Sequence, residues 1–557
     1  MYNILIGGAA GQGVETTVAI LEKAFKRAGY SVFTQRDFMS RVRGGHNFSL
    51  IRFGTDLVYG HSYHLDGLVA LDKLTLSEHL SWLSKNAFIL CDSSLQVSDA
   101  RAISIDMATT SKELGNPRVA GSIAIGAILK LFGESLDDAE GVLSAFLKPQ
   151  YLEVNLKALH EGYGMVEEHF PHLDGPHGRE LLISGSKAMA LGAIAAGLRF
   201  YSAYPMSPAT PLMEALASEA DDAGLVVEQA EDEIAAINMA LGASFAGARA
   251  MTGTSGGGFS LMVEALGLAG MAEIPLVIVD VQRPGPATGL PTRTEQSDLS
   301  FAISASQGEF PRVVMSVRNA EDAFYQTMRA FDLAERYQIP IIILSDQYVG
   351  DSSWTVASLN PARVSVAAIG DEVAQDGEYL RYRNTQNGIS PRLIPGISDQ
   401  VVAIDSDEHD EAGHITESAD VRKQMVDKRM RKFEGIKQDM QEPSFIGDEK
   451  FKVLLIGWGS MWAPLVEAVG LLNKKEYSRG YAALVFGDVY PLPQRVLLEK
   501  SQAAERIIDV EQNATGQLAD LIRRESGICC DERILKYDGR QFCGEEIAKR
   551  IEEVEGR

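Results

Sequence analysis

Short apolar runs lead into a glycine turn and then a helix-like segment at three places along the chain. They begin at "NILIGGAAGQG", "ELLISGSKAMALGAIAAG" and "FKVLLIGWGSMWAPLVEAVGLL". Such strand–turn–helix openings predict α/β units. Further Val- and Ile-rich runs, "GLVVEQ", "PLVIVDV" and "IPIIILSD", follow the second opening. Because these runs are apolar throughout, they predict buried strands of a parallel sheet that is covered by helices on both faces.

Changes in composition between these units predict the domain boundaries. A segment rich in proline, glycine and histidine over 169–180 indicates a linker. Polar residues dominate between the second and third units. We therefore expect a first domain over 1–172, a second over 181–355, an irregular connector over 356–449 and a third domain over 450–557. The small residues of "SKAMALGAIAAG" allow another helix or a ligand to approach closely.

Composition and charge indicate a globular protein and exclude several kinds of partner. Of the 557 residues 45% are hydrophobic and 23% charged, and no run approaches the roughly 18 apolar residues of a membrane span. The 52 Lys and Arg against 76 Asp and Glu give a net charge of −24, which repels nucleic acid and anionic lipid. No basic leader precedes the first apolar run, so we expect no signal peptide, no membrane and a cytoplasmic location.

The cysteines and the acidic segments offer no clear metal site. The 4 cysteines contain no CxxC pair, so we expect neither a disulfide framework nor a zinc or iron–sulfur site. The segment "DEHDEAGH" carries possible ligands, but adjacent side chains rarely converge on one ion. We interpret it as a solvated acidic loop and predict no metal on this chain.

Glycines at the first strand-to-helix turn are candidates for an anion site. Gly11 and Gly13 precede a helix start, where free N–H groups attract phosphate. They do not form GxGxxG, which disfavours NAD and leaves a phosphate-bearing ligand or a plain tight turn. In the nearby "RVRGGHN", Arg41 and Arg43 either grip phosphates or belong to a solvated turn.

Two further segments place polar groups where ligands bind in parallel sheets. "YSAYPMSPATP" over 201–211 has a backbone restricted by its prolines. "GLVVEQAEDEIAAINMALG" runs from a predicted buried strand into four acidic residues, Glu228, Glu231, Asp232 and Glu233. A helix start accounts for some of them, but a carboxylate at the mouth of a parallel sheet is also well placed for a ligand.

Taken together, these motifs resemble a known family. "YPMSPATP", "VEQAEDEIAAINMALGASFAGARAMTGTSGGG", "GPATGLPTRTEQSDL" and "VEQNATGQLADLIR", in this order, resemble the α subunit of 2-oxoacid:ferredoxin oxidoreductases. The start "GGAAGQGVET" with "RVRGGHN" resembles their γ domain, here fused ahead of α. The resemblance covers nearly the whole chain. It implies an α/β fold of three domains: a γ-type Rossmann-like domain, a thiamine-diphosphate pyrimidine-type domain and a transketolase C-terminal-like domain.

In that family two chains share one thiamine diphosphate. The resemblance implies that this chain supplies the aminopyrimidine side, and that a β subunit supplies the diphosphate–Mg site and a [4Fe-4S] cluster. The sequence agrees, since it has no GDG motif followed by paired asparagines. Ferredoxin as electron acceptor, coenzyme A as acyl acceptor and an (αβ)₂ assembly are implied in the same way.

The resemblance also assigns roles to residues of the cofactor sites. It makes Glu231 the carboxyl that hydrogen-bonds the pyrimidine ring nitrogen N1′ and acts in catalysis. Thr254, Ser255 and Gly256 complete the thiamine diphosphate contacts. The coenzyme A site is expected at four residues, Gly11, Gly13, Arg41 and Arg43.

The substrate carboxylate is expected at the proline-rich loop. Tyr204, Ser207 and Thr210 offer hydroxyls there. Ser207 stands where the family has threonine, and it lacks the methyl group that restricts χ1. A guanidinium binds a carboxylate through two parallel hydrogen bonds, so Arg293 in "PTRTEQ" is our first choice for a second anchor, with Arg283 in "VQRPGP" as the alternative.

The leading interpretation is the coenzyme A-dependent oxidative decarboxylation of a 2-oxoacid to acyl-CoA and CO₂, with electrons passing to ferredoxin. Fused γα chains often belong to 2-oxoglutarate enzymes, which favours that substrate over pyruvate and branched-chain or aryl 2-oxoacids. The direction, oxidation or CO₂ fixation, is left open by the sequence. Two alternatives are a self-contained thiamine-dependent decarboxylase or transketolase, which the missing diphosphate motif disfavours, and a non-catalytic acyl-CoA- or nucleotide-binding scaffold.

Overall fold

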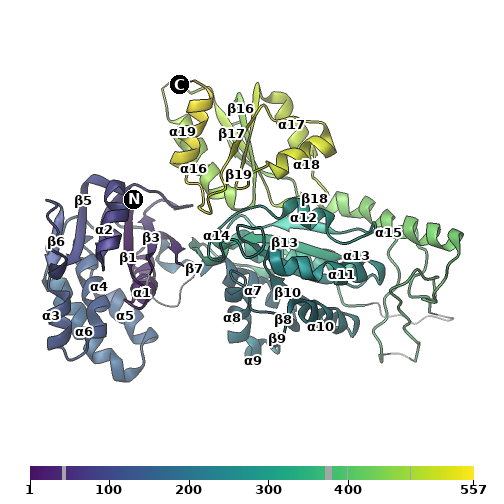
Figure 1. The fold of residues 1–557 in the computed structure, drawn as a ribbon, viewed down its shortest axis with the longest axis horizontal. Helices are drawn as coiled ribbons and strands as arrows, with labels where there is room; N and C mark the ends of the chain where they lie inside the picture. The colour runs from purple at the N-terminus through teal and green to yellow at the C-terminus, as the bar shows by residue number, and fades with distance from the viewer. Residues whose placement is uncertain (40–44, 371–378, 398, 477, 557) are drawn as a thin grey trace. The chain divides into compact units, whose positions relative to one another are not determined.

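The computed structural model describes residues 1–39, 45–370, 379–397, 399–476 and 478–556 (Figure 1). The chain divides into two compact units. The first comprises Met1–Ile183 with Ser352–Ser358, and the second Ser184–Asp351 with Leu359–Arg557. Three larger sheets are found in the described parts of the chain, and helices pack on each of them, so the predicted α/β fold is confirmed.

The first unit is built on a mixed eight-stranded sheet of order β6-β5-β4-β1-β3-β2-β14-β7. Its strands are β1 (Tyr2–Gly8), β2 (Ser31–Asp37), β3 (Asn47–Gly54), β4 (Leu65–Ala70), β5 (Leu83–Asp92), β6 (Ala102–Ile105), β7 (Leu181–Ser184) and β14 (Ser353–Val356). Its helices are α1 (Val14–Arg27), α2 (Lys73–His79), α3 (Met107–Glu113), α4 (Ala120–Leu131), α5 (Asp137–Phe146) and α6 (Pro149–Gly164). An aromatic cluster fills the core beneath α1, where the Phe25 and Phe53 rings stack with centroids 3.9 Å apart.

Strands β7 and β14, which precede and follow most of the second predicted domain in sequence, both join this first sheet. They are neighbours in the sheet, and β14 pairs antiparallel with β2. The Trp354 indole N–H donates to the Tyr59 carbonyl oxygen at 3.0 Å. Ser353–Val356 therefore lies inside the first sheet, between β2 and the edge strand β7, although we expected residues up to 355 within the second domain.

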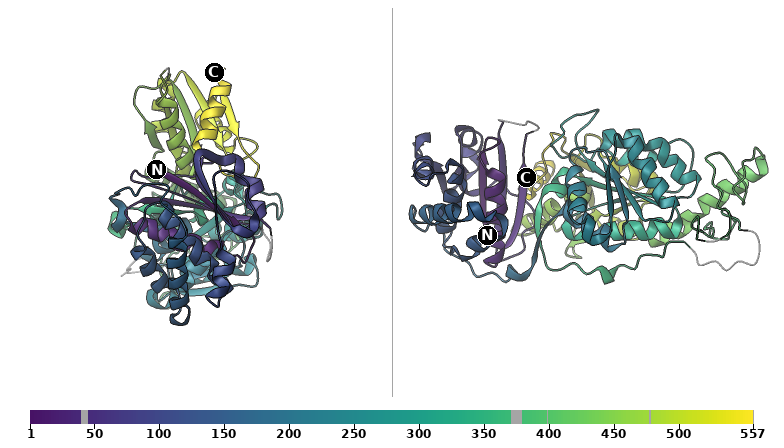
Figure 2. Two further views of the ribbon diagram at one scale, coloured as in Figure 1. Left: turned by 90° about the vertical axis from the view of Figure 1, so that its left-hand side faces the viewer. Right: turned by 90° about the horizontal axis from the view of Figure 1, so that it is seen from below.

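The second unit contains a seven-stranded sheet of order β18-β12-β13-β11-β10-β8-β9. Its strands are β8 (Phe200–Ala203), β9 (Val226–Gln229), β10 (Ala250–Thr254), β11 (Leu276–Gln282), β12 (Val313–Ser316), β13 (Pro340–Asp346) and β18 (Asp488–Tyr490). All neighbours are parallel except β12 and β18. Helices flank this sheet on both sides, as predicted (Figure 2); they are α7 (Gly185–Ala195), α8 (Thr210–Ser218), α9 (Ala220–Ala223), α10 (Glu233–Phe245), α11 (Gly256–Met271), α12 (Leu299–Ser304), α13 (Ala320–Tyr337) and α14 (Gln347–Asp351).

The small residues of α7 serve helix–helix packing. A Cβ atom at Gly192 would overlap the backbone of Phe324 in α13, so the two helices approach more closely than larger side chains would permit. Likewise, a Cβ at Gly185 would overlap the carbonyl of Val349 in α14.

The predicted burial of "GLVVEQ" is wrong. This run forms β9, which lies at the edge of the sheet and pairs with β8. Val226 is 54% exposed, whereas Leu225 just before the strand is buried. Side chains project from the faces of a sheet, and no element of the described chain covers Val226 at this edge strand.

A smaller sheet of order β15-β17-β16-β19-β20 completes the second unit. Its strands are β15 (Ser444–Gly447), β16 (Val453–Trp458), β17 (Tyr481–Phe486), β19 (Arg506–Glu511) and β20 (Glu532–Leu535), and its helices are α16 (Trp462–Asn473), α17 (Arg495–Ala503), α18 (Gln517–Ser526) and α19 (Gly544–Val554). Alternate residues of β16 face opposite ways. Leu454 and Ile456 join the core that also contains α10 and α11, while Val453 and Leu455 pack against α16 and α19.

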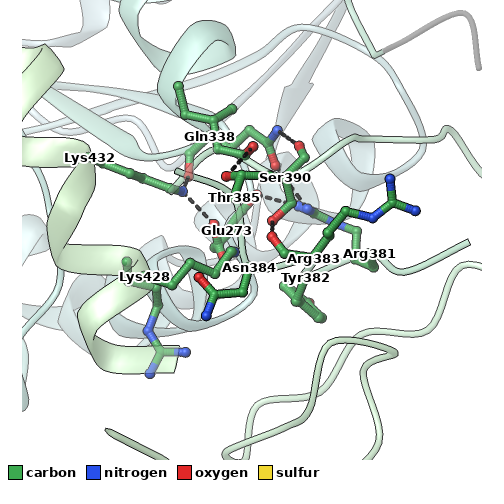
Figure 3. Close-up of polar contacts among 12 residues, drawn as sticks. Glu273, Gln338, Arg381, Tyr382, Arg383, Asn384, Thr385, Ser390, Lys428 and Lys432 are labelled. Carbon is green, nitrogen blue, oxygen red and sulfur yellow. Dashed lines mark hydrogen bonds and ion pairs between the residues drawn. The ribbon is translucent and has the colours of Figure 1, made fainter. Parts of the chain in front are cut away.

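The connector is fastened to the second unit by buried charges (Figure 3). Its helix α15 (Ala419–Asp439) places Lys428 and Lys432 each 2.5 Å from the fully buried carboxylate of Glu273. Arg381 donates to the Glu273 carbonyl oxygen at 2.7 Å and to Gln338 Oε1 at 2.9 Å. Burial favours a higher pKa for Glu273, but Lys432, Lys428 and Arg381 together hold that pKa well below its ordinary value.

We expect Glu273→Gln to lower the free energy of unfolding by about 3–5 kcal/mol, because it leaves two buried ammonium groups without their counter-charge. The exposed Glu309→Gln is the matched control. The pKa of Glu273 is depressed in the folded state, so its contribution is present above the ordinary value of 4.5 and is lost as the pH falls below it. Denaturant unfolding at several pH values measures this. Equal stability of the two variants at pH 7 would contradict the prediction.

Candidate active site

The carboxyl ends of β8, β10 and β11 meet at one edge of the second sheet, where ligands bind in parallel α/β folds. The loop after β8 places the Met206 methyl carbon 3.9 Å from the position that a Cβ at Gly257 would take. The loop after β11 places the Ala287 carbonyl oxygen 3.7 Å from the same position. Both loops therefore converge on the start of α11.

Several buried polar atoms around these strand ends have no hydrogen-bond partner within the described chain. They are Tyr201 Oη, Thr252 Oγ1, Ser255 Oγ, Glu233 Oε1 and both carboxyl oxygens of Asp280. Folded proteins leave few such atoms unsatisfied, and each needs an explanation. Their concentration at this edge of the sheet indicates a site that is completed by a ligand.

Glu233 is the buried carboxyl of this site. It is the first residue of α10, and Asp232 caps the helix by accepting from the Ala235 N–H at 2.7 Å. The Glu233 side chain lies against the first turn of α11, where a Cβ at Gly258 would fall 2.6 Å from Glu233 Oε1. Only glycine at 258 leaves room for this carboxyl.

Glu231, to which the family role was assigned, differs from Glu233 in its burial. Glu231 and Glu228 are exposed, whereas Glu233 is buried. The sequence holds a signal for this, because Glu233 shares the buried face of α10 with Ala236, Ile237 and Ala240, at the spacing of one helix face. The same helical spacing leaves Glu231 before the helix, and the role that we expected of Glu231 stays a prediction.

The proline-rich loop meets Arg283 rather than Arg293. Arg283 Nη1 donates to the Ser207 carbonyl oxygen at 2.6 Å. Ser207 and Tyr204 are exposed, and Thr210 is the first residue of α8. Arg293 instead lies beside the third sheet, with its Cβ 3.2 Å from the position that a Cβ at Gly539 would take. The alternative anchor is thus the one that lies at the loop.

Two aspartates that sequence reasoning missed lie close to this arginine. Asp280, in β11, is fully buried; burial and the charge of Asp298 raise its pKa well above the ordinary range, and Arg283 opposes the rise. Burial and the charge of Glu295 raise the pKa of Asp298 to about 6, again opposed by Arg283. A Cβ at Gly256 would come 2.5 Å from Asp298 Oδ2. An aspartate inside the apolar run "PLVIVDV" was the available signal for Asp280.

The remaining predicted cofactor residues lie at the start of α11. Thr254 ends β10, Ser255 is the N-cap residue of α11 and makes no side-chain capping bond, and Gly256 opens the helix. Their amide and hydroxyl groups face the same strand ends as Glu233.

The first unit has a cavity of about 620 Å³ at the start of α1. Gly11 and Gly13 line it, together with Thr16, Arg118 and Asn155. The two glycines have φ of 95° and 82°, a conformation that glycine adopts without strain. Arg41 and Arg43, the other residues predicted here, lie outside the described residues.

Neither a metal cluster nor a membrane span is found in the part of the chain that the structure describes. No three His, Cys, Asp or Glu side chains are grouped there to hold an ion. Glu408 of the acidic segment pairs with Arg422 and Arg429. None of the described helices has the length and apolar character to cross a membrane.

Sequence comparison identifies relatives over the full length of the chain. The family described as "Pyruvate flavodoxin/ferredoxin oxidoreductase, thiamine diP-bdg" matches residues 191–428, and "Pyruvate ferredoxin/flavodoxin oxidoreductase" matches residues 3–165. A 2-oxoacid:ferredoxin oxidoreductase subunit alpha of Sulfolobus sp is 31% identical, over 99% of this chain and 96% of that protein. The 2-oxoglutarate oxidoreductase subunit KorA of Mycobacterium tuberculosis is 32% identical, over 78% of this chain and 68% of that protein.

A solved structure has the same fold. It is a 2-oxoglutarate:ferredoxin oxidoreductase from Magnetococcus marinus, with 2-oxoglutarate, coenzyme A and succinyl-CoA bound. Its TM-score is 0.93 and its sequence identity 31%, with 99% of each chain covered. The resemblance inferred from the motifs is thereby confirmed. The chain belongs to the 2-oxoacid:ferredoxin oxidoreductases, as an alpha subunit of these enzymes.

Proposed function

We propose that this chain is the γα subunit of an enzyme that converts 2-oxoglutarate and coenzyme A to succinyl-CoA and CO₂ and transfers the electrons to ferredoxin. The observation that carries the proposal is the buried Glu233 carboxyl with an unpartnered oxygen, inside the segment that matches a thiamine diphosphate-binding family. The choice of 2-oxoglutarate is supported by the KorA relative and by the ligands of the Magnetococcus structure.

The strand-end site fits the aminopyrimidine side of thiamine diphosphate. Glu233 Oε1 lacks a partner and is available to a ring nitrogen, and the Ser255 hydroxyl also lacks one. The glycines at 256–258 bring backbone N–H groups within reach of a ligand. When bound, thiamine diphosphate supplies the nucleophile and the electron sink for decarboxylation. The part of Glu233 is to orient the ring and to hold a proton at its nitrogen.

The 2-oxoacid carboxylate is assigned to Arg283 and the proline-rich loop. The guanidinium already holds the Ser207 carbonyl, so both groups sit at one place with Tyr204 beside them in sequence. A guanidinium binds a carboxylate with two parallel hydrogen bonds. Burial lowers the pKa of Arg283, and the charges of Asp280, Asp298 and Glu233 oppose this, so the group stays a cation for an anionic substrate.

A partner chain would complete the site. Large apolar side chains are 40–54% exposed around it, on the proline-rich loop, on β9 and on α10 and α11, namely Tyr204, Val226, Ile234, Met239 and Leu261. Large exposed apolar side chains on the elements of one site support a protein interface there. We assign this face to a β subunit that carries the diphosphate–Mg site and the [4Fe-4S] cluster, in an (αβ)₂ enzyme, and the cavity beside Gly11 and Gly13 to coenzyme A.

Isolation of the chain from its host without denaturation tests the function. We expect it to copurify with a brown iron–sulfur subunit. The preparation should reduce viologen with 2-oxoglutarate in a coenzyme A-dependent reaction, and faster than with pyruvate or branched-chain 2-oxoacids. Preference for another 2-oxoacid would overturn the substrate. A colourless chain that neither binds thiamine diphosphate nor reduces the dye would overturn the proposal.

Substitution of the two glutamates distinguishes their roles. We expect Glu233→Gln to lower kcat by about 100-fold or more, since an amide cannot hold the proton that the carboxyl holds. Glu231→Gln is the matched control and should stay within about threefold of the wild type by the same reasoning. Steady-state kinetics of the holoenzyme give both values, and a larger loss in the Glu231 variant would refute the assignment.

The two arginines are compared in the same way. We expect Arg283→Lys to raise the KM for the 2-oxoacid by about tenfold or more, because an ammonium cannot form the paired hydrogen bonds of a guanidinium. Arg293→Lys should change this KM much less. The KM for coenzyme A serves as the internal reference, and a reversed order would restore Arg293 as the anchor.

A further inference from the structure

A loop over 291–298 connects the candidate active site with the third sheet. One end of the loop carries Asp298, which lies against Gly256 at the start of α11. The other part is bound to the segment after β19; Gln296 and Gln512, which contact each other there, are 216 residues apart in the chain. The residues that bind the loop have no role in the chemistry described so far.

Two buried glutamines form the centre of this contact. The Gln296 N–H donates to the Gln512 carbonyl oxygen at 2.7 Å, and the Gln512 N–H donates to Gln296 Oε1 at 3.2 Å. Gln296 Nε2 donates to the Trp458 carbonyl at 2.8 Å, and Gln512 Nε2 to the Thr294 carbonyl at 3.0 Å. Both glutamines are at most 1% exposed. Hydrogen bonds that are this well shielded from water hold their groups firmly in place, because a lost partner leaves a buried polar atom unsatisfied.

Asn513 fixes the adjoining part of the loop. Its Nδ2 donates to the Gln296 carbonyl at 3.0 Å and to Glu511 Oε2 at 2.8 Å. Glu511 in turn accepts from the N–H groups of Leu518 and Ala519 at the start of α18. The contact is thus anchored in a helix N-terminus of the third domain.

Gln517 binds the loop on both sides of Asp298. Its Nε2 donates to the Ser297 carbonyl at 2.7 Å, and its Oε1 accepts from the Ser300 N–H at 2.8 Å. The Asp298 N–H itself donates to Gln282 Oε1 at 3.0 Å. One side-chain amide therefore spans the aspartate and leaves little freedom to its backbone.

Asp298 lies next to the strand end that carries the substrate anchor, because its N–H donates to the side chain of Gln282, the residue before Arg283. The charge of Asp298 also acts on the Arg283 guanidinium. The charge of Asp298 also raises the pKa of Asp280. A small displacement of Asp298 would change the charge that surrounds Arg283 and hence its affinity for a carboxylate.

We propose that Gln512, Asn513 and Gln517 of the third domain are positioning residues that set the place of Asp298, and through it the charge beside Arg283 where the carboxylate binds. This proposal rests on the proposed function, in which Arg283 binds the 2-oxoacid carboxylate. It gives the third domain, whose strands supply no residue to the site, a defined effect on substrate affinity.

The test uses the holoenzyme with Gln517→Ala, because Gln517 is only half-buried and its loss leaves no large cavity. We expect the KM for the 2-oxoacid to rise about tenfold, as misplacement of a binding group commonly causes. The KM for coenzyme A and the melting temperature should stay unchanged. Gln517→Glu keeps the acceptor for Ser300 and should show an intermediate KM.

Gln494→Ala is the matched control. Gln494 is also a half-buried glutamine of the third domain, but its side chain donates to Glu525, within that domain. The control should leave the KM for the 2-oxoacid within twofold of the wild type. An equal change in both alanine variants would attribute the effect to general loosening of the domain and overturn the proposal.

A double-mutant cycle with Asp298→Asn tests whether Gln517 affects the KM through Asp298. If Gln517 acts through Asp298, Gln517→Ala should change the KM less than twofold in the Asp298→Asn background. Effects that multiply, or a Gln517→Ala enzyme with wild-type KM, would overturn the inference. A wild-type holoenzyme that oxidises no 2-oxoacid would instead refute the proposed function, before any variant is compared.

Discussion

The site depends on one close contact, that between the Glu233 carboxyl and the glycine turn at the start of α11. A buried carboxyl is costly unless it finds a hydrogen-bond partner, yet Glu233 Oε1 has none within the described chain. The contact exists because Gly258 has no Cβ. The same turn brings backbone N–H groups to the edge of the sheet. In the function proposed above, a ring nitrogen of the cofactor partners the carboxyl, and acceptor groups of the cofactor partner the backbone N–H groups.

The second and third sheets are joined by a common apolar core and by buried hydrogen bonds, in addition to the chain that connects them. Leu454 and Ile456 of β16 join the apolar core of α10 and α11, and the buried amides of Gln296 and Gln512 bind the two parts beside that core. Buried ion pairs at Glu273 fasten the connector to the same unit. The second unit is therefore one packed body, in which residues after β19 bind the loop over 291–298.

Much of the fold was readable from local patterns. The three strand–turn–helix openings correspond to β1 with α1, β7 with α7, and β16 with α16, because apolar runs and glycine turns act over a few residues. Sheet membership was not readable, as β7 and β14 show by joining the first sheet. The burial of β9 was misjudged for a related reason. An apolar run indicates that a strand will be covered, but not whether its own chain or another chain covers it.

By itself, the sequence determined the family, the α/β class, the glycine turns and the lack of a diphosphate motif, since each of these is written in neighbouring residues. Only the tertiary structure showed that Glu233 is buried while Glu231 is exposed, and that Arg283 rather than Arg293 bonds the proline-rich loop. The first difference depends on which face α10 turns to the sheet, and the second on the path of a loop that the third domain holds. Both are set by packing between segments far apart in the chain, and no local pattern contains that information.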